Sequence, residues 1–79
     1  MEIKLNELNL NKSGIVKQIN CSDNIKTRLL DLGIINGTKI MPIFRSMLGD
    51  PTAYMIRGSM LAIRETDAKE IIVLPDQEM

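Results

Sequence analysis

The sequence has no histidine and no tryptophan, and Cys21 is its only cysteine. Without histidine, the chain lacks the commonest general base and the commonest metal-binding side chain, so zinc sites and histidine-dependent catalytic triads are excluded in their usual forms. A single cysteine forms no internal disulfide bond, and a lone thiol suits a reducing compartment. We therefore expect a cytoplasmic protein that is not an enzyme.

Net charge and long hydrophobic runs are also missing. Ten basic and ten acidic residues cancel in a chain of 79 residues, so no long-range field attracts the protein to nucleic acid or to an anionic membrane. Apolar runs such as residues 71–74 are far shorter than the roughly 20 residues that cross a bilayer. No phosphate-binding loop is present, so we expect no bound nucleotide. We predict one domain over residues 1–79, without cofactor, membrane insertion or nucleic-acid partner.

A short amphipathic helix is predicted over residues 23–32. Ile25, Leu29 and Leu32 recur at i, i+4 and i+7, which indicates one buried face. Gly33 suits the left-handed position that follows a helix C-terminus. Leu30 lies about 100° around the helix from Leu29, so we expect it at the margin of the buried face or in solvent.

Five runs of apolar and β-branched residues between turn formers predict β-strands. These are residues 15–20, 39–45, 53–57, 60–64 and 71–74. Ile15 and Ile19 are the expected core residues of the first strand. Pro42 indicates an edge strand or a bulge, because proline cannot donate to the strand ladder. Gly58 and Ser59 are typical of a two-residue type II′ hairpin turn.

A short turn is expected at residues 6–8, and Thr66 or Asp67 is expected to cap a helical turn that ends at Glu70. Strands this short leave exposed edges unless the sheet curls on itself. The pattern therefore predicts a mostly β fold. It is a small SH3-like five-stranded barrel with one short α-helix after the first strand and one helical turn before the last.

Methionine is frequent, with six residues in the chain. Soft thioethers select Cu(I) and not Fe²⁺, so we interpret most methionines as adaptable core side chains. Met47 and Leu48 differ, because they lie in a turn-rich loop with Gly49 and Asp50 where no strand or helix period explains burial. We predict that Leu30, Met47, Leu48, Gly49 and Asp50 form a partner-binding surface. The alternative is that the loop folds back and buries its apolar pair.

Charged residues provide no clear metal or anion site. The acidic residues Asp23, Asp31, Asp50, Glu65, Asp67 and Glu70 are spread along the chain and are interpreted as solvated. Lys26, Arg28 and Lys39 are interpreted as a solvated face with local ion pairs, and Arg28 could instead anchor the helix to the barrel. We assign no metal ligand and no catalytic residue.

The order and spacing of several segments resemble the FeoA family. The matching segments are residues 8–19 with Gly14, the helix-to-strand residues Arg28, Leu29, Leu32, Gly33 and Gly37, the loop residues Gly49, Asp50 and Pro51, and the hairpin residues Tyr54, Ile56, Gly58, Leu61, Ala62, Ile63 and Arg64. Each motif alone suits any small barrel, and the specificity lies in their combination. The likeness covers nearly the whole chain.

The resemblance implies an SH3-like fold and a role in ferrous iron transport, a process that involves transition metal ion binding. It implies a cytoplasmic accessory protein that docks on the cytoplasmic domain of the transporter FeoB and modulates transport or nucleotide turnover. The same domain is similar to the C-terminal module of iron-dependent repressors, so the alternative is a metal-sensing or regulatory SH3-like module. Those repressors carry an N-terminal helix-turn-helix that is absent from this chain, which disfavours DNA binding.

Overall fold

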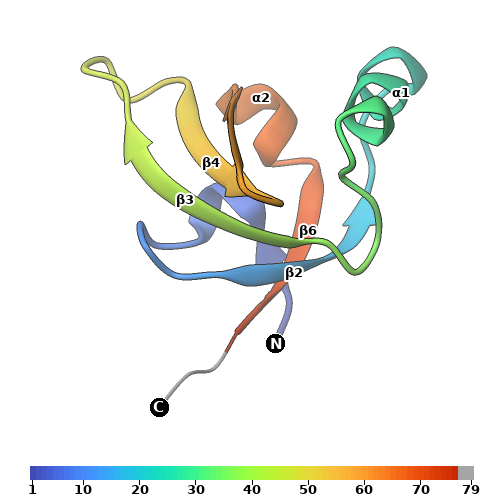
Figure 1. The fold of residues 1–79 in the computed structure, drawn as a ribbon, viewed down its shortest axis with the longest axis horizontal. Coiled ribbons are helices and arrows are strands. Elements are labelled where there is room, and N and C mark those ends of the chain that lie inside the picture. The colour runs from blue at the N-terminus through green and yellow to red at the C-terminus, as the bar shows by residue number, and fades with distance from the viewer. Residues whose placement is uncertain (77–79) are drawn as a thin grey trace.

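The computed structural model describes residues 1–76 and shows one curled antiparallel sheet with two short helices (Figure 1). The elements are β1 (Ile3–Lys4), the 3₁₀ turn η1 (Leu5–Glu7), β2 (Gly14–Ile19), α1 (Asp23–Asp31), β3 (Lys39–Arg45), β4 (Thr52–Ile56), β5 (Ser59–Ile63), α2 (Glu65–Ala68) and β6 (Ile71–Pro75). The strand order is β1-β6-β2-β3-β4-β5. The mostly β architecture is confirmed, with α1 after β2 and a helical turn before β6.

The sheet has one strand more than the five predicted. The additional strand is β1, in which Ile3 and Lys4 pair with Val73 and Ile72 of β6. Two residues carry too little pattern to indicate a strand, and the pairing partner lies at the far end of the chain. The five predicted strands each lie within one residue of an observed strand at both ends.

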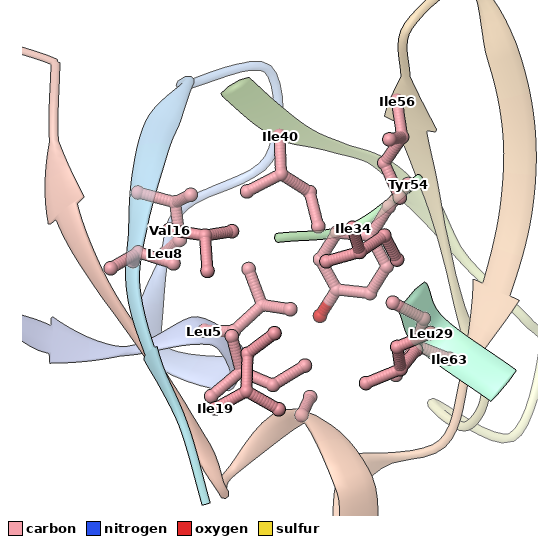
Figure 2. Close-up of a cluster of buried hydrophobic side chains, with 13 residues drawn as sticks. Leu5, Leu8, Val16, Ile19, Leu29, Ile34, Ile40, Tyr54, Ile56 and Ile63 are labelled. Carbon is pink, nitrogen blue, oxygen red and sulfur yellow. The ribbon is translucent and has the colours of Figure 1, made fainter. Parts of the chain in front are cut away.

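A single cluster of buried side chains fills the interior of the curled sheet (Figure 2). Its members come from β2 to β6, from η1, α1 and α2, and from the segments that follow η1 and α1. They are Leu5, Leu8, Val16, Ile19, Leu29, Ile34, Ile40, Tyr54, Ile56, Ile63, Ala68, Ile71 and Val73. Burial of this apolar surface is the main favourable term for so small a domain.

The core residues of β2 differ from the prediction at one position. Ile19 is buried as predicted, but Ile15 is only half-buried and Val16 is fully buried in its place. The pairing of β2 with β6 shifts register between Val16 and Gln18. Such a bulge adds one residue to the strand, so two residues of different parity can face the same side.

Helix α1 buries Leu29 as predicted, but Leu32 is 46% exposed, contrary to the predicted stripe. Leu32 caps the helix, and the chain reverses at Gly33, where φ is +89°. The Gly33 N–H donates to the Leu30 carbonyl at 2.9 Å and the Ile34 N–H donates to the Leu29 carbonyl at 2.9 Å. This reversal carries Ile34 into the core, where it occupies the space predicted for Leu32.

The β4–β5 hairpin turns one residue earlier than predicted. Ile56 pairs with Ser59, so the two turn residues are Arg57 and Gly58, with φ of 50° and 84°. Positive φ at both positions defines a type I′ turn, so the predicted type II′ turn at Gly58 and Ser59 is wrong. The Arg57 stem packs over Gly33, since a Cβ at Gly33 would lie 3.2 Å from the Arg57 Cδ. The contact thus forms at the turn where Arg57, a residue other than glycine, adopts a positive φ.

Pro42 lies at a bulge, as one of the two predicted alternatives stated. The pairing of β3 with β4 shifts register between Pro42 and Phe44. The other alternative, an edge strand, is wrong, because β3 lies between β2 and β4. On the β3 side, only Lys39 and Ile40 pair with β2. Pro42 lies beyond this short ladder, so its missing N–H removes no hydrogen bond between β2 and β3.

Truncation of Leu29 should destabilise the fold strongly. The side chain is 2% exposed and belongs to the central cluster, so Leu29→Ala should lower the free energy of unfolding by about 2 to 5 kcal/mol. Leu30→Ala is the matched control on the same helix, because Leu30 is 59% exposed. Urea unfolding followed by circular dichroism measures both, and equal midpoints for the two variants would contradict the observed helix orientation.

The stability of the protein should also fall at alkaline pH because of Tyr54. Figure 2 shows its hydroxyl directed into the core, and burial raises the pKa of Tyr54 above its ordinary value. The unfolded tyrosine ionises first, near pH 10, so this group contributes no pH dependence below that range and destabilises the fold above it. Tyr54→Phe should reduce the decline. Tyr54 is the only tyrosine, so ultraviolet absorbance of the phenolate reports its titration directly.

Candidate docking surface

The loop between β3 and β4, residues 46–51, directs two apolar side chains into solvent. Met47 and Leu48 are 103% and 95% exposed. The loop is held by its own hydrogen bonds: the Gly49 N–H donates to the Ser46 carbonyl at 2.8 Å, and the Ser46 hydroxyl donates to the Asp50 carbonyl at 2.7 Å. The alternative in which the loop folds back and buries this pair is therefore excluded.

Asp50 fixes this loop to the start of α2. Its Oδ1 accepts a hydrogen bond from the Glu65 N–H at 2.8 Å, and so satisfies one of the free amides of the first helical turn. The predicted caps Thr66 and Asp67 are wrong, because α2 begins at Glu65 after Arg64. The capping carboxylate comes instead from a residue fifteen positions earlier, which no local pattern indicates.

Leu30 lies in a groove at the other side of the molecule. The groove has a volume of about 500 Å³ between the outer face of α1, the end of β2 and the segment that leads to β3. Its apolar lining comes from Ile19, Leu30, Ile34 and Ile35. Leu30 and Ile35 are about half exposed, so the groove is a concave apolar surface that is open to solvent.

The structure separates Leu30 from the loop residues with which it was grouped. Figure 1 shows the β3–β4 loop and α1 at opposite ends of the molecule, with β3 running between them. Of the predicted partner surface, Met47, Leu48, Gly49 and Asp50 lie together in one loop, and Leu30 belongs to the separate groove. The predicted exposure of these apolar side chains is observed, but they form two surfaces and not one.

The outer face of the sheet carries a row of methionines that were predicted to lie in the core. Met41 pairs with Met55, and Met55 pairs with Met60, so the three lie side by side on β3, β4 and β5. Met55 and Met60 are 37% and 46% exposed, and Met41 is half-buried. The interpretation of most methionines as core side chains is therefore wrong for residues 1–76.

Strand alternation could have located this methionine row. Ile40, Tyr54 and Ile56 are buried, and neighbours along a strand face opposite sides of the sheet. Met41 and Met55 must therefore face outward once Ile40 and Tyr54 face the core. The residue type alone could not indicate the outward orientation, because methionine occurs both in protein cores and on exposed binding surfaces.

The charged and sulfur side chains do not converge on a metal site within the described part of the chain. No group of three or more cysteine, aspartate or glutamate side chains is close enough there to hold an ion. Burial raises the pKa of the Cys21 thiol, with further contributions from Asp67 and Glu70, which disfavours the thiolate that binds metal. The thiol lies 3.6 Å from the Asp67 carbonyl, to which it can donate.

The three basic residues singled out in the sequence do not share one anion site. Lys26 lines the groove beside Leu30, whereas Lys39 forms an ion pair with Asp76 at 3.8 Å. Arg28 is exposed on α1. Among residues 1–76, no helix is long and apolar enough to span a bilayer.

A family model for the FeoA domain matches residues 3–75 of the chain. The chain belongs to the FeoA family. FeoA proteins are accessory proteins of ferrous iron transport and are not enzymes. Among curated proteins, none matches this chain significantly.

Solved structures share the fold over nearly the whole chain. A FeoA-like protein from Clostridium acetobutylicum is 32% identical, with 99% of this chain and 91% of that chain covered and a TM-score of 0.86. FeoA of Stenotrophomonas maltophilia, solved with zinc and described as a prokaryotic SH3 domain protein, is 27% identical, with 90% and 88% covered and a TM-score of 0.78. The SH3-like fold is thereby confirmed.

A more distant protein also shares the fold. IdeR from T. acidophilum is 22% identical, with 95% of this chain but only 34% of that chain covered and a TM-score of 0.82. At this identity the likeness concerns the fold alone.

The isolated protein should bind Fe²⁺ only weakly. It has no histidine, and the described residues include no cluster of carboxylate and thiol ligands. Single exposed carboxylates must therefore bind Fe²⁺ in competition with water, which gives a low affinity. Anaerobic equilibrium dialysis at micromolar Fe²⁺ measures this, with Cys21→Ser as the variant that removes the only thiol. Stoichiometric retention of iron would contradict the prediction and would indicate a carrier role.

Proposed function

We propose that this protein docks on the cytoplasmic domain of the ferrous iron transporter FeoB and modulates transport or nucleotide turnover. Membership of the FeoA family supports the process, because FeoA proteins serve ferrous iron transport. The exposed pair Met47 and Leu48 supports the mode of action, since it offers contact area and no reactive chemistry. The protein acts by binding at the cytoplasmic face of the membrane.

The β3–β4 loop is suited to act as the anchor of this interaction. Two nearly fully exposed apolar side chains gain free energy when a partner pocket covers them. The hydrogen bonds of Ser46, Gly49 and Asp50 hold the loop in place, so little conformational entropy is lost on binding. A neutral chain has no steering charge, so its affinity must come from such apolar anchors.

The groove beside α1 supplies a second and separable contact. Leu30 is 59% exposed at its rim, and the groove is concave where the loop is convex. The two surfaces lie at opposite ends of the molecule, so a substitution in each tests them separately. We propose the β3–β4 loop as the main contact with FeoB. The groove around Leu30 is the alternative contact surface.

Replacement of Met47 and Leu48 by serine should weaken binding to FeoB without loss of the fold. The side chains contact little of their own protein, so stability should change by less than about 0.5 kcal/mol. Binding to the FeoB cytoplasmic domain should weaken by about ten- to a hundredfold if they fill a partner pocket. Titration calorimetry measures the affinity, and circular dichroism confirms the fold.

Two single variants serve as controls in the same titration. Met55→Ser removes an exposed methionine from the outer face of the sheet and should leave FeoB binding unchanged. Leu30→Ser tests the groove. Normal affinity and normal iron-dependent growth with the loop double variant, together with weaker binding for Leu30→Ser, would move the interface to the groove.

A further inference from the structure

Strand β5 ends the sheet and is hydrogen-bonded to one neighbour, β4. Edge strands usually carry a charge, a proline or a bulge that blocks pairing with another chain. Residues Ser59–Ile63, with the sequence Ser-Met-Leu-Ala-Ile, contain no charge and no proline. Their pairing with β4 runs without a register shift. The edge therefore lacks the usual protection.

The hairpin geometry determines which backbone groups face this open edge. In a two-residue turn the closing pair, Ile56 and Ser59, is hydrogen-bonded, and hydrogen-bonded pairs then alternate along the ladder. Leu61 and Ile63 therefore bond to β4, whereas the N–H and C=O groups of Met60 and Ala62 point away from it. In residues 1–76, no backbone hydrogen bond from outside the sheet reaches either residue.

Two apolar rows on the outer face of the sheet end at these same two residues. The methionine row runs from Met41 through Met55 to Met60. The phenylalanine row runs from Phe44 through Ala53 to Ala62, and Phe44 is 55% exposed. Each row thus reaches the open edge with an outward-facing apolar side chain.

We propose that β5 pairs antiparallel with β5 of a second copy of this chain, in a register centred on Leu61. In this register Met60 lies opposite Ala62 of the second copy, and the converse pair is equivalent by symmetry. Both residues present free N–H and C=O groups, so two such pairs form four backbone hydrogen bonds. The five residues of β5 overlap completely.

The side chains on the outer face match in the same register. The methionine row of one copy continues into the phenylalanine row of the other, so that large Met60 meets small Ala62 at both junctions. The result is two apolar rows, each six side chains long, across both sheets. Apolar cross-strand neighbours of complementary size stabilise a sheet.

Strand overlap favours this register over its neighbour. A centre at Met60 would place Ala62 and Ile63 opposite the turn residues Gly58 and Arg57 of the second copy. Only three residues of each strand would then overlap, in place of all five. The chain has zero net charge, so no long-range repulsion opposes the association of two copies.

The interface is small, so the dimer should be weak and reversible. One pair of five-residue strands buries less than the roughly 1,200 Å² of a stable complex, which places the dissociation constant on the order of 0.1 mM. The proposed dimer interface contains none of the residues Met47, Leu48 and Leu30. Its test is therefore independent of the test for docking on FeoB.

Sedimentation velocity from about 10 µM to 1 mM should show the native chain passing from monomer to dimer, at the affinity expected for a small interface. Ala62→Pro is the sharpest variant, because the Ala62 N–H faces the open edge and proline is tolerated there. Circular dichroism should show the native fold, and the dimer should weaken at least tenfold. Ala62→Lys should do the same by placing a charge in the apolar row.

Cysteine cross-linking tests the register in a Cys21→Ser background. A mixture of Met60→Cys and Ala62→Cys chains should form a disulfide-linked dimer under mild oxidation, whereas either chain alone should form at least tenfold less. Met55→Cys, one strand away from the edge, is the matched control. A monomer at 1 mM, a dimer that Ala62→Pro leaves intact, or cross-linking that ignores the register would each overturn the proposal. The proposal would also be overturned if the native chain stayed monomeric and Ala62→Lys abolished binding to FeoB. The open edge would then pair with a strand of the transporter.

Discussion

The reversal of the chain at Gly33 is the interaction on which the arrangement of α1 depends. The Ile34 N–H and the Leu29 carbonyl meet across this reversal at 2.9 Å, and both side chains enter the core within a few residues of each other. Because these two residues face inward, Leu30 and Ile35 must face outward, which forms the apolar groove. The Arg57 stem packs over Gly33, so the β4–β5 turn and the helix end are stabilised together.

A curled sheet of short strands encloses a single core. Apolar side chains on the outer face of the sheet cannot be buried in that core. The core is filled by isoleucine, leucine, valine, one alanine and one tyrosine, while the methionines of β3, β4 and β5 face outward. The apolar surface that remains outside the core has no structural partner in the described chain. Methionine suits such a surface, because its flexible thioether adapts to different contacts. The outer face and the loop tip are thus the parts of the molecule from which binding functions can arise.

The chemistry of the surface agrees with the role of the family. FeoA proteins are accessory proteins of ferrous iron transport, and the side chains gathered on this surface are apolar and methionine-rich. Asp50, the acidic residue of the exposed loop, is already engaged with the Glu65 N–H. The loop therefore presents shape and apolar area, with its one carboxylate used to hold it in position.

Local patterns alone determined five of the six strands, the helix and the exposure of Met47, Leu48 and Leu30. Period-two and i, i+4 spacing, together with turn residues such as Gly33, are short-range signals that each segment carries by itself. The tertiary structure alone decided the pairing of β1, the bulge that exchanges Ile15 for Val16, the replacement of Leu32 by Ile34 in the core, and the capping of α2 by Asp50. These features depend on contacts between residues far apart in the chain, and a local pattern holds no information about the partner. The same reason separated Leu30 from the loop, since the phase of a helix shows that a side chain is exposed but not which distant surface lies beside it.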